Sequence, residues 1–179
     1  MKFLFLILIL VLETFGDDGV KNISSKQLNV LQTVRNIAKS IPDKQGKTYE
    51  NTISAICLTE SSAGKNNIGD YRHKRSFTKA SLGPMQIRLD TARHVANQIK
   101  TLRWLNDLND VQLAARLLGD IRLSAKVATY YVILLHEKRN DHFNAVSGYN
   151  GGMSNRPYYN RVMKNLALVN ELVSAGRLT

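Results

Sequence analysis

Apolar residues recur at intervals of three and four positions along most of this chain, and this spacing constrains the fold more than any other feature. Leu28, Leu31, Val34 and Ile37 show it most clearly, in a segment that ends at Pro42. Because an α-helix turns once about every 3.6 residues, this spacing places one apolar stripe along a helix. We therefore predict helices over residues 27–41, 49–62, 111–118, 121–137, 143–149 and 158–172. A further helix follows residues 81–86 and runs to about residue 99, and Pro84 suits either a turn or the first helical turn.

Residues 64–82 interrupt the pattern with glycines, asparagines and basic side chains, and they predict a long loop or a small hairpin. Convincing strands are few elsewhere, and the sequence contains no internal repeat, low-complexity tract or heptad pattern. The predicted fold class is therefore mainly α, with at most a small hairpin. A long irregular insert in a domain of this size is usually functional.

The chain begins with a short positive end and an apolar run from Phe3 to Leu12. This run is shorter than the roughly 20 apolar residues that span a bilayer, and residues 14–16 offer small residues where a signal peptidase inspects the chain. We predict a cleaved signal peptide over residues 1–16 and a single globular domain over residues 17–179, with no stable membrane span after cleavage. The predicted location is secreted, periplasmic or at the cell surface, and a retained anchor is the alternative.

The formal net charge of +11 at pH 7 indicates an anionic partner, which leaves nucleic acid, anionic lipid or an acidic cell-wall polymer. Residues 72–75 and Lys79 are basic and are interleaved with aromatic residues, as in some nucleic-acid-binding loops. No recognised nucleic-acid-binding motif accompanies them, so we expect no nucleic-acid partner and predict that the loop binds anionic wall material. A solvated loop that binds nothing is the alternative.

Neither the cysteine nor the histidines predict a metal site. Cys57 has no second cysteine to pair with and lies on an apolar stripe, which predicts a buried core residue. The histidines, by contrast, are scattered, and their spacing does not place two ligands on one helical face; they are His73, His94, His136 and His142. We predict no metal and no cofactor.

Glu60 occupies a position on the second predicted helix where a core residue belongs. Ile53, Ile56 and Cys57 fall on the same stripe at helical spacing. A carboxylate there is costly to ionise, because desolvation favours the protonated form and raises the pKa, as a general acid near neutral pH requires. The alternative is a helix-end glutamate that points into solvent and has no catalytic role.

Three other polar residues are candidates for ligand binding. Tyr149 and Asn150 lie at a predicted helix end before a pair of glycines, and they offer a hydroxyl, a stacking face and a two-sided amide, the groups that bind a sugar. A plain helix end followed by a loop is the alternative. Gln86 lies between two apolar residues and is either a binding amide or part of an exposed helix start.

Four short motifs follow one another along the chain: Glu60-Ser61, Gly83-Pro84-Met85-Gln86, Gly148-Tyr149-Asn150, and Tyr158 with Val162. Each is weak alone, but together and in this order they resemble the successive motifs of the soluble lytic transglycosylase family of peptidoglycan-cleaving enzymes. The resemblance runs from about residue 49 to about residue 164. The chain departs from the family at Pro84, where a larger apolar residue is usual, at Gly148, where Ala is usual, and in its long basic insert before Ser81.

The resemblance implies a lysozyme-like (α+β-type), mainly helical domain with a cleft for the glycan strand. It also implies that Glu60 is the sole catalytic acid and base. The implied substrate-binding residues are Ser61, Gln86, Tyr149, Asn150 and Tyr158, and the two tyrosines also help to orient the carboxyl group.

The implied reaction cleaves the bond between N-acetylmuramic acid and N-acetylglucosamine, with closure of a 1,6-anhydro ring in place of attack by water. One carboxylate suffices for this, whereas an ordinary glycosidase needs two. The nearest alternative is a phage-type lysozyme in which Glu60 and Asp70 hydrolyse the same bond, and a non-catalytic peptidoglycan-binding assembly module is another. The expected partner is the glycan strand of peptidoglycan, and a role in a secretion, conjugation or phage apparatus is left open.

Overall fold

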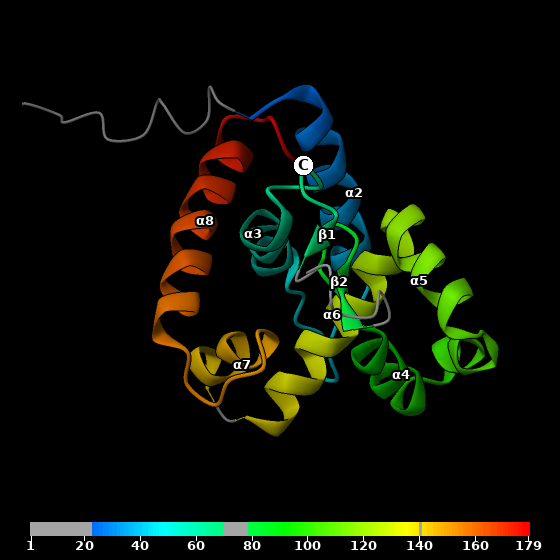
Figure 1. Cartoon of the computed structure of the whole chain (residues 1–179). Helices are drawn as coiled ribbons and strands as arrows, with labels where there is room; N and C mark the ends of the chain where they lie inside the picture. Colours follow the sequence, from blue (N-terminus) through cyan, green and yellow to red (C-terminus); the bar gives the residue numbers. More distant parts are fainter. Residues whose placement is uncertain (1–22, 70–78, 140) are drawn as a thin grey trace, which may run out of the picture.

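The computed structural model describes residues 23–69, 79–139 and 141–179 and is mostly helical (Figure 1). The helices and strands are α2 (Ser25–Lys39), α3 (Glu50–Ser61), β1 (Ile68–Gly69), β2 (Ser81–Leu82), α4 (Leu89–Gln98), the 3₁₀ helix η2 (Lys100–Asp107), α5 (Asp110–Gly119), α6 (Ile121–Lys138), α7 (His142–Tyr149) and α8 (Arg156–Ser174). The prediction of a mainly helical, lysozyme-like domain with a small hairpin is confirmed. In the described part of the chain, the helices are too short or too polar to cross a membrane.

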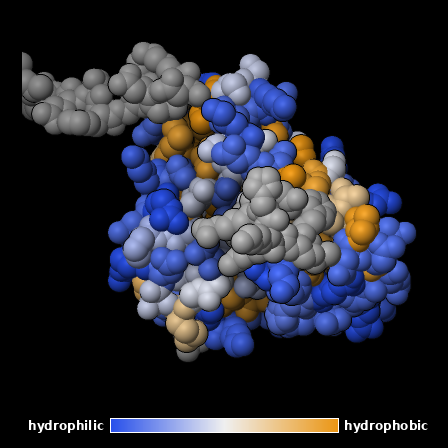
Figure 2. Space-filling model, viewed as in Figure 1, coloured by the Kyte–Doolittle hydropathy of each residue, from blue (hydrophilic) through white to orange (hydrophobic). Residues whose placement is uncertain are grey.

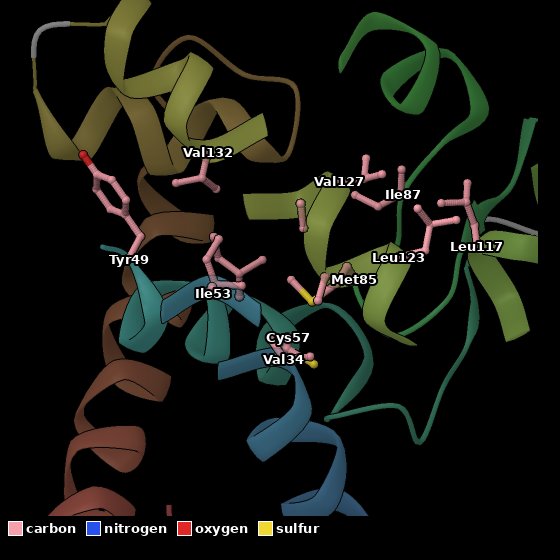
Figure 3. Packing of buried hydrophobic residues seen from close by; sticks show 14 of the residues in the cluster. Val34, Tyr49, Ile53, Cys57, Met85, Ile87, Leu117, Leu123, Val127 and Val132 are labelled. Atoms are coloured by element: carbon pink, nitrogen blue, oxygen red, sulfur yellow. The ribbon is translucent and has the colours of Figure 1, made fainter. Parts of the chain in front are cut away.

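Helix α3 lies at the centre of the domain and packs against α2, α6 and α8 (Figure 1). Its residues Ile53, Ile56 and Cys57 have no exposed surface. Val34 of α2 and Val132 of α6 are also buried in this core (Figure 3). Burial of each such side chain contributes about 1.5–3 kcal/mol, so α3 is held by its apolar residues on nearly every side.

Cys57 is a core residue, as predicted. Its thiol is fully buried, and burial raises the pKa of Cys57 to about 12. Because the thiolate is the reactive form, this cysteine is inert at neutral pH. The large apolar side chains exposed among the described residues are Ile68, Trp104, Val111 and Met153, and hydrophilic side chains cover most of the face seen in Figure 2.

Polar side chains fix where several helices begin. The Ser24 hydroxyl accepts from the backbone N–H of Gln27, and the Gln27 side chain accepts from the Ser24 N–H, which forms a capping box at the start of α2. Asp120 accepts from Leu123 at the start of α6, and Asp141 caps α7 in the same way. These caps account for the close agreement between the predicted and observed helix starts.

The turn after the hairpin shows which of the two alternatives for Pro84 holds. The strands β1 and β2 pair antiparallel, with Ile68 opposite Leu82, and Leu82 then pairs with Ile87 through backbone hydrogen bonds of 3.0 and 2.9 Å. Residues 83–86 therefore form a tight turn that contains Pro84, and α4 begins at Leu89. The turn requires Gly83, which has a φ of +73° and whose added Cβ would lie 2.1 Å from the carbonyl oxygen of Leu117.

The predicted signal peptide at residues 1–16, the basic residues 72–75 and Asp70 lie outside the described residues. The 3₁₀ helix η2 was not predicted. Only Leu102 and Leu105 of its eight residues are buried, and one pair three positions apart is too short a pattern to indicate a helix.

Candidate active site

A cleft of about 630 Å³ opens between the hairpin, the turn before α4, α6 and the end of α7. Its lining includes Glu60, Gly69, Ser81, Gln86, Arg88, Asp90, Thr91, Tyr131, Tyr149 and Asn150. Residues from distant parts of the chain therefore meet in one concave site. Among the described residues, no group of three or more histidine, cysteine, aspartate or glutamate side chains is arranged to hold a metal ion.

Glu60 is half-buried and lies one residue before the end of α3. The helix stops there because Ser62, Ala63 and Gly64 take positive φ values of 52°, 54° and 79°, which no helix continues. Residues 53, 56 and 57 face the core, as the apolar stripe predicts, while the Glu60 carboxyl group lines the cleft. The raised pKa expected for Glu60 stays a prediction.

Tyr158 contacts the Glu60 carboxylate from the buried side, opposite the cleft. Its hydroxyl donates a hydrogen bond of 2.6 Å to Glu60 Oε1, and the ring is only 1% exposed. Burial and the neighbouring charge of Glu60 raise the pKa of Tyr158 far above its ordinary value. Tyr158 therefore stays protonated and remains a hydrogen-bond donor to the carboxylate. Because it is buried and does not line the cleft, the expectation that Tyr158 binds substrate is wrong.

Tyr149 forms part of the cleft wall. Its hydroxyl donates to the carbonyl oxygen of Met85 at 2.8 Å, which ties the end of α7 to the turn before α4. Burial raises the pKa of Tyr149 well above its ordinary value, and the charge of Glu60 adds to this effect. The ring lies 5.6 Å from that of Tyr131 of α6, measured between centroids. The two tyrosines thus present adjacent aromatic surfaces to the cleft.

Ser61 differs from the prediction that it contacts substrate. It is fully buried, donates to the carbonyl oxygen of Pro84 at 2.7 Å and accepts from the backbone N–H of Gly64 at 2.7 Å. Consecutive helical residues point about 100° apart, so Ser61 faces inward where Glu60 faces the cleft. Ser61 therefore connects the end of α3 to the turn that carries Gln86.

Gln86 and Asn150 both line the cleft, as predicted. Gln86 has a φ of +48°, and its amide nitrogen donates to the carbonyl oxygens of Gly83 at 2.9 Å and Asn66 at 3.2 Å. Gly69 leaves room for the Gln86 side chain, because a Cβ at position 69 would lie 2.1 Å from Gln86 Oε1. Asn150 is exposed at the edge of the cleft.

Some cleft residues were missed by sequence reasoning. Tyr131 was read as part of the apolar face of α6, and only its place beside a second tyrosine at position 130 hints that one of the two faces a site. Arg88 and Asp90 form an ion pair of 3.2 Å, and the hydrogen bond from Arg88 lowers the pKa of Asp90. Asp90 is therefore an ionised carboxylate at the cleft, held by a neighbouring guanidinium group.

Gly148 makes room for Arg139. A Cβ at Gly148 would lie 2.5 Å from Arg139 Nη1 and 2.8 Å from Leu135 Cδ2. The same nitrogen of Arg139 donates to the carbonyl oxygens of Asn144 at 2.8 Å and Gly152 at 2.7 Å. A cation at the C-terminal end of α7 also favours the helix dipole. The glycine found where the family usually has alanine thus fits an arginine that holds the turn after Tyr149.

We expect Gly148→Ala to destabilise the protein by about 1–3 kcal/mol, as overpacking of a filled site does. The measurement is the midpoint of thermal unfolding. Gly119→Ala is the matched control, because a Cβ at Gly119 would meet nothing within 4 Å. Equal melting temperatures for the two variants would contradict the packing of Arg139 against Gly148.

Comparison with known proteins agrees with this geometry. The family described as transglycosylase SLT domain matches residues 38–167, more than two thirds of the chain. The match contains Glu60, Gln86, Tyr149, Asn150 and Tyr158. Neither a curated protein nor a solved structure gives a significant match. The cleft and the match together show that the chain belongs to the transglycosylase SLT domain family, whose general activity is the lytic cleavage of peptidoglycan.

Proposed function

We propose that this protein is a peptidoglycan lytic transglycosylase. It cleaves the β-1,4 bond between N-acetylmuramic acid and N-acetylglucosamine and leaves 1,6-anhydro-N-acetylmuramic acid ends, with Glu60 as the single acid and base. The observation that carries the proposal is the Glu60 carboxylate at the cleft, held by the 2.6 Å hydrogen bond from Tyr158. The protein acts after export, at the peptidoglycan of the periplasm or cell surface.

The reaction begins with a proton on the Glu60 carboxyl group. Glu60 donates this proton to the oxygen between the two sugars, the bond from that oxygen to C1 of the muramic acid breaks, and N-acetylglucosamine leaves as an alcohol. The acetamido oxygen of the muramic acid stabilises the positive charge that develops at C1. The Glu60 carboxylate then removes the proton from the C6 hydroxyl, and O6 attacks C1 to close the anhydro ring. Glu60 ends protonated, and no water is consumed.

The surrounding residues have separate proposed roles in this scheme. Tyr158 keeps the carboxylate in one orientation through both proton transfers, because its own pKa is too high for it to lose a proton. Gln86 and Asn150 supply amide groups for the acetamido and hydroxyl groups of the glycan strand. Tyr149 and Tyr131 provide ring surfaces along which a sugar lies.

The direct test is incubation of the purified protein with insoluble peptidoglycan. We expect soluble muropeptides to be released. Absence of release, with the protein shown to be folded by its circular dichroism spectrum, would contradict the proposed function and favour a non-catalytic wall-binding module.

Hydrolysis with Asp70 as a second carboxylate is the other candidate reaction. If Glu60 works alone, Asp70→Asn should lower the cleavage rate less than about tenfold and leave the product ends unchanged. Asp90→Asn is a useful comparison, since Asp90 is a carboxylate at the cleft that is already paired with Arg88. If Asp70→Asn lowered the cleavage rate as much as Glu60→Gln does, the hydrolytic mechanism would be favoured.

A further inference from the structure

Helix α8 has a polar residue on the face that packs against the core. The buried residues of this helix are Tyr158, Val162, Val169 and Leu172. Asn165 is half-buried and lies on the same face, three positions after Val162 and four before Val169, where helical spacing calls for an apolar residue. An asparagine at such a position gives up apolar packing, and in return its amide can fix how two helices align.

The amide of Asn165 is bonded to Thr59, the residue before Glu60 on α3. Asn165 Nδ2 donates a hydrogen bond of 2.8 Å to Thr59 Oγ1, which itself donates to the carbonyl oxygen of Ala55 at 2.8 Å. Because a hydroxyl has a single proton, Thr59 accepts from Asn165 while it donates within its own helix. This bond is directional, whereas the apolar contacts between the two helices are not. It therefore fixes the position of α8 along α3.

The same bond lies close to the contact between Tyr158 and Glu60. Asn165 follows Tyr158 by seven positions, about two helical turns, and Thr59 is next to Glu60. At the start of α8 the side chain of Asn155 accepts from the backbone N–H of Tyr158 at 3.1 Å. Tyr158 thus lies between a helix cap and an interhelical bond. A shift of α8 along α3 would change the 2.6 Å hydrogen bond that the Tyr158 hydroxyl donates to Glu60.

We propose that Asn165 is a positioning residue for the reaction: its bond to Thr59 sets α8 against α3 so that the Tyr158 hydroxyl meets the Glu60 carboxylate. Asn165 does not line the cleft, so its effect passes through Tyr158 and not through contact with the glycan. This inference rests on the proposed function and deepens it. Its loss should lower kcat and leave KM nearly unchanged, because it alters the placement of the acid and base more than the binding of substrate.

A second bond between the same two helices provides the matched control. Asn51 Nδ2 donates to Asn170 Oδ1 at 2.9 Å, and Asn51 lies nine positions before Glu60, about 13 Å along the helix. Asn165→Leu and Asn170→Leu each remove one such bond, and thermal unfolding checks that both variants fold. We expect Asn165→Leu to lower kcat about three- to tenfold, whereas Asn170→Leu should stay within about twofold of the unaltered protein.

A double variant shows whether Asn165 acts through Tyr158. In the Tyr158→Phe protein the hydroxyl that Asn165 places is absent, so adding Asn165→Leu should lower kcat by less than about twofold more. A role in general stability would instead multiply the two losses. Thr59→Val removes the hydroxyl and should match the loss of Asn165→Leu, while Thr59→Ser keeps the hydroxyl and should retain most of the activity. The two Thr59 variants decide the question if Asn165→Leu does not fold.

The outcomes separate the two proposals. The positioning role is overturned if Asn165→Leu loses no more kcat than Asn170→Leu, if the losses multiply in the double variant, or if Thr59→Val is as active as Thr59→Ser. Each of these results would leave the lytic function standing. If the unaltered protein releases no muropeptides, the proposed function is wrong and the positioning role falls with it.

Discussion

Replacement of Glu60 by Gln should abolish peptidoglycan cleavage while leaving the fold intact. The amide conserves the shape of the side chain, and its carbonyl oxygen can still accept the hydrogen bond from Tyr158. It cannot donate a proton to the bond oxygen and then accept one from a hydroxyl group. The expected loss of turnover is about a thousandfold or more, typical of removing an essential acid and base.

The measurement is the initial rate of muropeptide release, with thermal unfolding as the check on folding. Glu171→Gln is the matched control, because it makes the same chemical change on α8 at a residue that does not line the cleft. Retention of more than about a tenth of the unaltered rate by Glu60→Gln would show that Glu60 is not the catalyst.

Tyr158→Phe should give the second largest effect. Phenylalanine fills the buried site but removes the hydroxyl that donates to Glu60 Oε1. A hydrogen bond to a charged group is worth about 1.5–3 kcal/mol, which corresponds to a loss of roughly ten- to a hundredfold. Because Tyr158 does not line the cleft, the loss should fall on kcat, with KM nearly unchanged.

Tyr159→Phe is the control for this substitution. Tyr159 is the next residue of α8, its ring packs against that of Phe143 with 5.0 Å between centroids, and it does not line the cleft. Its activity should stay within about twofold of the unaltered protein. If Tyr158→Phe also kept its full kcat, the hydrogen bond to Glu60 would have no part in orienting the carboxylate.

The helices were largely predictable from the sequence because their apolar spacing and their polar caps are local. Residues 121–137 were predicted for α6, which runs from Ile121 to Lys138. The start of α4 stayed open in the sequence, because the tight turn at residues 83–86 depends on the pairing of Leu82 with Ile87 and on a positive φ at Gln86. Neither leaves a periodic pattern in the sequence.

The cleft was predictable only where local patterns and ordered motifs marked its residues. Glu60 was identified from its place on an apolar stripe, and Gln86, Tyr149 and Asn150 from their positions and the order of the motifs; the structure brings them together. The adjacent Ser61 was misassigned, because a motif does not tell which of two neighbouring residues faces inward. Tyr131 was missed, since an aromatic residue on a helix with an apolar stripe reads as core.

Contacts between distant segments explain the rest. The fit of Arg139 to Gly148 joins the end of α6 to α7, and it accounts for a glycine that departs from the family pattern. This fit follows from tertiary packing and could not be read from either segment alone.

The central claim is that Glu60 cleaves the glycan strand without water, and the mass of the products tests it most directly. Muropeptides released from purified peptidoglycan by the unaltered protein should be analysed by mass spectrometry. We expect ends of 1,6-anhydro-N-acetylmuramic acid, lighter than the hydrolytic products by one water molecule. Products with predominantly free reducing ends would contradict the transglycosylase mechanism.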